Sequence, residues 1–346
     1  MNNSPGKALR DIEAVDTAAS LIENSNGSAS EVGDNVQSEV SNITINEVVR
    51  LREGLVGSLN PSFGPVIGNW SVWTEGKVVI GKTDASTTAS KKEIEVQSIS
   101  LGFDKPVGDD ELIGFVLSIG QDNIDIGTAL TNVKSDNYSL SNYNVLKLGS
   151  NTLLENVLGL GHLEFDTIRT DSSDTLTGKR KAKQLFLSTT LRPEETIIIG
   201  NWKVSPYSKL TLANTRLNGF SESGASTALT FNKQKIRDAG LSVGMDINSS
   251  VTINNTTINP YAKVEYDRSS SKTLASMHYN NEDASMYLYT SSFNKQIKNW
   301  KLKLGADLTT GSGWDSSIRF TREKPLGSGE ASKYLNSYSF NASIKF

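Results

Sequence analysis

The chain has 346 residues, with 35 Lys and Arg residues against 38 Asp and Glu residues and a formal net charge of −3. This balance argues against a nucleic-acid partner, because such a partner requires a basic face. The sequence contains no cysteine, so thiolate catalysis, zinc ribbons and iron–sulfur clusters are excluded, and its two histidines, His162 and His278, offer little for a metal site. We therefore predict no catalytic residue, no cofactor and no metal ion.

Helices and linkers are predicted for the first 68 residues. Residues 8–22 place apolar side chains at helical spacing, and a linker rich in Ser, Asn and Gly follows over residues 24–35. A second helical pattern runs over residues 45–56. The opening residues, MNNSPGK, lack an apolar stretch, so we expect no signal peptide and interpret the chain as truncated or as a domain excised from a longer precursor.

From residue 69 to the C-terminus the hydrophobic period changes to two, which is typical of half-apolar strands. Lys263, Glu265 and Asp267, for example, share one face of a strand whose other face is apolar. That polar face is compatible with the lumen of a barrel and equally with the solvent-exposed face of a soluble β-sandwich. Twelve strands are predicted, over residues 69–82, 94–104, 111–119, 136–148, 157–170, 181–191, 197–219, 236–247, 257–269, 298–308, 314–323 and 336–346.

The connections between these strands favour a barrel in a membrane. In chain order they hold 11, 6, 16, 8, 10, 5, 16, 9, 28, 5 and 12 residues, so every odd connection is longer than every even one. Long extracellular loops on one rim and short periplasmic turns on the other give this alternation. Aromatic residues near strand ends fit interfacial girdles, namely Trp70, Trp73, Trp202, Tyr207, Trp300, Trp314 and Tyr338.

The last strand ends the chain on an aromatic residue in a regular apolar register. Tyr338, Phe340, Ala342, Ile344 and Phe346 occupy every second position. A soluble domain gains little burial from an aromatic residue at the tip of a strand. The pattern resembles the terminal strand of Gram-negative outer-membrane barrels, and this resemblance implies that the five residues are the signal for the barrel-assembly machinery.

The wider pattern resembles the β-domain of monomeric autotransporters, the translocators of type V secretion. A helix and linker lead into the strand WSVWTEG at residues 70–76, and the resemblance covers about residues 45–346. Further matching pieces are LGFD at residues 101–104, VSPY at 204–207, LNGFSE at 217–222 and LGADL at 304–308.

This resemblance implies an all-β fold, a 12-stranded antiparallel transmembrane β-barrel with an N-terminal helix threaded through the pore. Residues 1–40 would be a residual passenger or linker, residues 41–68 the pore helix and linker, and residues 69–346 the barrel. In the helix, Arg50, Arg52 and Glu53 would face polar groups of the lumen.

The implied place of action is the outer membrane of a Gram-negative bacterium. The implied partners are outer-membrane lipid, the barrel-assembly machinery and the chain's own passenger segment, and the protein would be a monomer. No Asn-Asn pair lies in the candidate helix, so self-cleavage inside the pore is not expected.

Two alternatives share the barrel. One is a passive porin or adhesin, in which the N-terminal segment has no transport role. The other is an omptin-like protease, in which His278 beside Glu282 and Asp283, or His162 near Glu164, activates water. The pattern Gly-x-Ser-x-Gly at residues 240–244 lies within a strand, so it is not interpreted as a nucleophile elbow.

Overall fold

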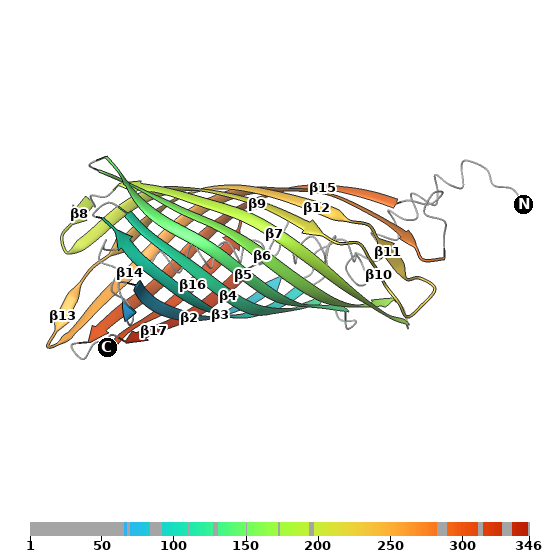
Figure 1. Ribbon diagram of the computed structural model, residues 1–346, viewed down its shortest axis with the longest axis horizontal. Helices are drawn as coiled ribbons and strands as arrows, with labels where there is room; N and C mark the ends of the chain where they lie inside the picture. Colours follow the sequence, from blue (N-terminus) through green and yellow to red (C-terminus); the bar gives the residue numbers. More distant parts are fainter. Residues whose placement is uncertain are drawn as a thin grey trace, which may run out of the picture.

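The computed structural model describes residues 66–67, 70–83, 92–108, 111–126, 131–149, 151–171, 174–193, 197–281, 289–310, 314–326 and 334–344. Within these residues the fold is all-β (Figure 1). In the same ranges no helix is long and apolar enough to cross a membrane.

Twelve strands of 11–24 residues dominate the described part of the chain. They are β2 (Trp70–Thr83), β3 (Lys92–Val107), β4 (Glu111–Ile126), β5 (Thr131–Leu148), β6 (Thr152–Asp171), β7 (Asp174–Pro193), β9 (Trp202–Leu217), β12 (Gln234–Asn248), β14 (Thr256–Tyr279), β15 (Tyr289–Thr310), β16 (Trp314–Pro325) and β17 (Tyr334–Ile344). Short pieces complete the sheet, namely β1 (Val66–Ile67), β8 (Ile197–Ile199), β10 (Phe220–Ser221), β11 (Leu229–Phe231) and β13 (Val251–Ile253).

All pairings in this sheet are antiparallel, and each long strand pairs with the next long strand along the chain. The last strand, β17, also pairs with the first long strand, β2, and places Tyr338 opposite Val78. The result is a strongly curled antiparallel sheet whose two outermost long strands are hydrogen-bonded to each other (Figure 1). The all-β antiparallel prediction is therefore confirmed.

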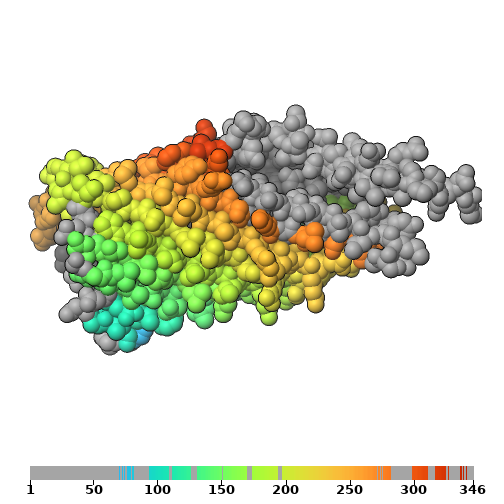
Figure 2. Space-filling view, turned by 90° about the horizontal axis from the view of Figure 1, so that it is seen from above, coloured from blue at the N-terminus to red at the C-terminus, as the bar shows by residue number. Residues whose placement is uncertain are grey.

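The two faces of the curled sheet have opposite polarity. Ser242 on β12 is 1% exposed on the inner face, whereas its neighbour Leu241 is 58% exposed on the outer face. On β14 the inner face carries Lys263, Glu265 and Asp267, all buried, as the sequence pattern predicted. Figure 2 shows one side of the outer surface, where segments coloured from cyan through green and yellow to orange follow one another across the sheet.

Soluble monomers rarely expose an apolar face of this extent. Each exposed Leu would forgo about 1.5–3 kcal/mol of hydrophobic stabilisation in water. The exposed apolar residues recur at alternate positions on neighbouring strands, among them Ile99, Leu101, Phe103, Leu117, Ile119, Leu140, Leu158, Leu160, Leu185, Leu210, Leu212, Val243, Leu302 and Leu304. A lipid environment removes the cost of their exposure.

The inner face also holds two apolar clusters that the alternation of the sequence did not predict. The first contains Ile94, Val96, Ile124, Val133, Leu163, Phe165, Ala182, Leu217 and Ile236. The second contains Leu112, Val116, Tyr143, Val145, Leu153, Val157, Phe186 and Ala213. Both lie along the wall from β3 to β12, so part of this wall is packed as a protein core.

The predicted regular alternation of connection lengths is wrong. Residues 171–180 were expected to form a loop, yet β6 and β7 stay paired as far as Asp171 opposite Asp174, and only residues 172–173 connect them. The expected loop residues continue the ladder instead, because pairing satisfies their backbone groups. The longest connection, residues 218–233, contains β10 and β11, and β14 ends beside it, with Tyr279 opposite Leu229.

The predicted strand over residues 197–219 is also divided. Residues 197–199 form β8, which folds back on β9, and Gly200 occupies the turn with a φ of 62°. Glycine adopts this left-handed conformation without the steric cost that a Cβ atom brings. Together with β13, the β8 turn marks the end of the sheet opposite to β10 and β11 (Figure 1).

Close approach of an aromatic ring to a strand glycine gives a stability prediction. A Cβ atom at Gly159 would lie 2.1 Å from Cζ of the Phe186 ring and 2.4 Å from Oγ of Ser141, whereas at Gly161, on the same strand and face, the nearest atom is Cβ of Gln184 at 3.5 Å. We expect Gly159→Ala to lower the free energy of unfolding by about 1–3 kcal/mol. Gly161→Ala is the matched control and should change it by less than about 1 kcal/mol.

Urea unfolding in detergent micelles, followed by tryptophan fluorescence, measures both variants. Equal transition midpoints for Gly159→Ala and Gly161→Ala would contradict the ring packing described for Phe186.

Candidate functional site

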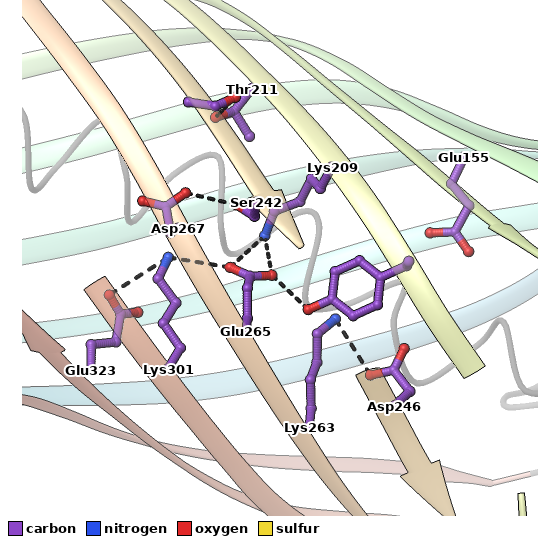
Figure 3. Close-up of polar contacts among 12 residues, drawn as sticks. Glu155, Lys209, Thr211, Ser242, Asp246, Lys263, Glu265, Asp267, Lys301 and Glu323 are labelled. Atoms are coloured by element: carbon purple, nitrogen blue, oxygen red, sulfur yellow. Dashed lines mark hydrogen bonds and ion pairs between the residues drawn. The ribbon is translucent and has the colours of Figure 1, made fainter. Parts of the chain in front are cut away.

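A network of charged side chains on the inner face is centred on Glu265 of β14. Lys209 Nζ, from β9, donates hydrogen bonds to Glu265 Oε1 at 3.0 Å and to Oε2 at 2.7 Å. The Tyr207 hydroxyl donates to Oε2 at 2.7 Å, and Lys301 Nζ, from β15, lies 3.6 Å from Oε1. The carboxylate of Glu265 therefore joins three strands, as Figure 3 shows for Lys209 and Lys301.

The network continues across the wall in both directions from Glu265. On one side Lys301 Nζ lies 3.7 Å from Glu323 Oε2 of β16. On the other side Asp246 of β12 lies 3.6 Å from Lys263 (Figure 3). Asp246 also lies 3.0 Å from Arg192. A separate ion pair then joins Arg192 Nε to Glu155 Oε1 at 2.8 Å. Charges of opposite sign are thus interleaved from β6 to β16.

Tyr207 is fixed at the middle of this network. Its ring lies beneath Lys263 Nζ, which is 4.1 Å from the ring centroid, and a Cβ atom at Gly244 of β12 would meet the Tyr207 hydroxyl at 2.4 Å. The side chain is buried on the inner face. The prediction that Tyr207 belongs to an interfacial girdle is therefore wrong. Trp202, Trp300 and Tyr338 are exposed, as a girdle requires, but Trp300 lies in the middle of β15 and not near a strand end.

A second polar group lies on the opposite part of the inner wall, on β3, β4 and β5. The Tyr143 hydroxyl donates to Asp104 Oδ2 at 2.5 Å, and Ser135 Oγ donates to Asp122 Oδ2 at 2.7 Å. Ser100 and Ser118 share a hydrogen bond of 2.7 Å. These buried hydrogen bonds lie on the same strands as the two apolar clusters.

At the end of the sheet with β10 and β11, a buried ion pair holds the 218–233 connection against the wall. Arg169 of β6 donates from Nε and Nη2 to the two carboxylate oxygens of Glu222, at 3.1 and 2.7 Å. The rings of Phe220 and Phe231 stack with centroids 4.7 Å apart, and Arg180 lies over Phe220. Sequence reasoning missed this clamp, although Phe220 and Glu222 belong to the segment 217–222 that carries the family resemblance.

The five predicted assembly residues are only partly described. Tyr338 and Phe340 are exposed on the outer face of β17, and the Tyr338 ring lies 5.3 Å from that of Phe320. Ala342 and Ile344 belong to the paired part of β17, opposite Ser316 and Trp314. Phe346 lies outside the described residues, as do the predicted pore-helix residues Arg50, Arg52 and Glu53.

The two histidines considered for a protease lie on different strands of the sheet. His162 of β6 lies 3.1 Å from Glu164, which is also bound by Lys181 at 2.6 Å. His278 lies on β14, pairs with Thr230 of β11, and therefore does not occupy the loop in which it was expected. Three strands, β7, β9 and β12, separate β6 from β14 in the sheet. Glu282 and Asp283 lie outside the described residues.

The serine of the Gly-x-Ser-x-Gly pattern has a structural role. Ser242 lies within β12, as expected, and its hydroxyl donates to Asp267 Oδ1 at 2.7 Å (Figure 3). Across the described ranges, no cluster of three or more acidic or histidine side chains is arranged to hold a metal ion. The part of the inner wall around Ser242 and Glu265 is a polar surface whose charges are paired with one another.

Comparisons with known proteins agree with this geometry. The sequence model of a family described as Autotransporter beta-domain matches residues 72–321. Among solved structures, the translocator domain of the autotransporter NalP from Neisseria meningitidis is similar at 14% identity and a TM-score of 0.71, with 92% of this chain and 100% of that chain covered. The β-domain of the Bordetella autotransporter BrkA gives 11% identity and a TM-score of 0.58, covering 80% and 100%. No curated protein sequence matches the chain.

The fold and the polarity of its two faces define an outer-membrane transport barrel of the Gram-negative type, in which the protein's role is not enzymatic. The family match covers more than two thirds of the chain, and the chain belongs to the autotransporter β-domain family. It is a translocator domain of type V secretion, which serves export of a passenger.

The ion pairs of the wall give a second stability prediction. Glu265→Gln removes the anion that Lys209 binds, so a buried ammonium loses its partner, and we expect the free energy of unfolding to fall by about 3 kcal/mol. Glu164→Gln is the control, because the Glu164–Lys181 pair is exposed, and should cost less than about 1 kcal/mol.

Urea titrations of the parent and both variants, each folded in the same detergent, give these values. A loss for Glu265→Gln no larger than that for Glu164→Gln would contradict a structural role for the Glu265 network.

Proposed function

We propose that the curled sheet is a closed twelve-stranded barrel that spans the outer membrane and encloses a passage for the chain's own N-terminal segment. The observation that carries this proposal is the inverted polarity of the sheet, with paired charges buried on the inner face and apolar side chains exposed on the outer face. The pairing of β17 with β2 supports closure. A β-sheet that spans a bilayer must close into a barrel, because closure leaves no backbone N–H or C=O group unpaired at a sheet edge.

The proposed division of the chain follows from this arrangement. Residues 1–40 are the passenger or linker segment, residues 41–68 are the pore helix and linker, and residues 69–346 are the barrel. β2 begins at the end of the sheet that also carries β8 and β13, so a segment that precedes β2 enters the passage there. A helix over residues 40–58 would be about 28 Å long at ~1.5 Å per residue, which matches an apolar band of about 25 Å.

The charges of this proposed helix suit the wall. Arg50, Arg52 and Glu53 carry both signs, and so does the wall, through Lys209 and Glu265 among others. A charged helix is tolerated in a polar lumen and is strongly disfavoured against lipid. Shielded from lipid by the barrel, the helix would occupy the passage as a plug.

Assembly of the barrel is proposed to depend on the terminal strand. The outward exposure of Tyr338 and Phe340 supports recognition of the apolar register of β17, with Ala342, Ile344 and Phe346, by the barrel-assembly machinery. With its edges paired, the sheet offers no strand for edge-to-edge association, which supports a monomer.

Conductance in planar lipid bilayers tests whether the N-terminal segment fills the passage. Deletion of residues 1–58 should raise the single-channel conductance several-fold over that of the full chain, because the proposed plug is removed. Deletion of residues 1–39 is the control and should leave the conductance low, because the proposed helix remains. Equal conductance for all three proteins would refute the plug and favour a passive porin or adhesin.

A further inference from the structure

A row of cations crosses the outer face near the end of the sheet with β10 and β11. The strand register places Lys183 of β7 directly opposite Arg216 of β9, and Arg216 directly opposite Lys235 of β12. Two residues after Lys235 on β12, Arg237 is directly opposite Lys272 of β14. All five side chains are exposed. The neighbouring residues Ala182, Leu217 and Ile236 are buried on the inner face, so the row points outward, and the register places Lys272 beside Arg237 on the same face. We refer to these five residues as the cationic row.

The cationic row is not balanced by carboxylates. Among the residues that the structure describes, none of the five forms an ion pair. The outward positions of β9, β12 and β14 from Thr256 to Leu274 carry no Asp or Glu. The neighbouring lysines of β7 differ, since Lys179 pairs with Asp166 at 3.2 Å and Lys181 pairs with Glu164 at 2.6 Å.

Such an arrangement destabilises the folded protein by itself. Side chains directly opposite on neighbouring strands have Cβ atoms only about 5 Å apart, and like charges in such pairs repel each other. The row from Lys183 to Lys235 crosses three strands and therefore spans about 10 Å at ~4.8 Å per strand. A bound anion with several oxygens would convert this repulsion into attraction, with Arg216 able to bind it through two N–H groups.

The position of the cationic row on the outer face indicates which class of anion it could bind. Along the outward faces of the same strands, the cations give way to exposed apolar side chains, namely Leu185, Leu212 and Leu241. The cationic row thus borders the apolar face that we assign to lipid. The bordering rim carries the longer connections, which is the extracellular side of an outer-membrane barrel. The head groups of the outer leaflet lie at this boundary.

We propose that the cationic row binds the phosphate groups of a phosphorylated glycolipid in the outer leaflet. This inference rests on the proposed membrane-spanning barrel and its orientation. The acyl chains of the lipid would pack on the exposed leucines, while Lys183, Arg216 and Lys235 would contact one phosphate and Arg237 with Lys272 a second. Lipid bound to β7, β9, β12 and β14 would then fix the depth of the barrel in the membrane.

Binding of diphosphorylated lipid A to the purified full chain in detergent tests the proposal directly. The variant Lys183→Gln/Arg216→Gln/Lys235→Gln should bind fluorescent lipid A at least tenfold more weakly than the parent. The control variant Lys179→Gln/Lys181→Gln/Lys203→Gln loses the same charge and should bind within about twofold of the parent. Parent binding should also weaken steeply with added salt.

Three results would overturn the proposal. They are equal binding by the parent and the cationic-row variant, equal binding of lipid A from which both phosphates have been removed, and full competition by inorganic phosphate at the concentration of the lipid. Removal of charges that repel each other should not impair folding of the triple variant. The single variant Arg216→Gln repeats the lipid A binding measurement with a smaller change. Because binding is measured without export, its failure is distinguishable from a failure of the threaded passage, which conductance reports.

Discussion

Pairing of β17 with β2 is the constraint on which the rest of the structure depends. It gives the outermost long strands hydrogen-bonding partners, so neither edge is left open in the described part of the sheet. A sheet joined in this way has an inner face, turned toward itself, and an outer face that meets the surroundings. The sequence then assigns polarity to each, with Glu265 and Lys209 inside and residues such as Leu241 outside.

Much of this could be predicted from the sequence, because a period of two is a local property of the chain. The alternation around Ser242 and Glu265 placed both on the inner face correctly. Contacts between distant residues could not be predicted in the same way, since Lys209 and Glu265 are 56 residues apart and meet only through the register of β9, β12 and β14. Tyr207 was misassigned for this reason, because its partner Glu265 was unknown.

The residues at which strands begin and end were the least predictable feature of the fold. Polar residues near position 175 were expected to form a loop, but the ladder between β6 and β7 continues through them, since a polar strand beyond a membrane loses nothing by staying paired. The turn at Gly200 was missed because one glycine within an apolar run is compatible with an unbroken strand. The helix proposed for residues 40–58 remains a prediction from the sequence.

The most direct test of the account is the location of the N-terminus in cells. A signal peptide and an epitope tag fused ahead of Met1 would be expressed in a Gram-negative host, with a second tag after Phe346. The account predicts that antibody labels the first tag on intact cells and reaches the second only after the outer membrane is opened. A first tag that also requires opening of the membrane would contradict passage of the N-terminal segment through the barrel.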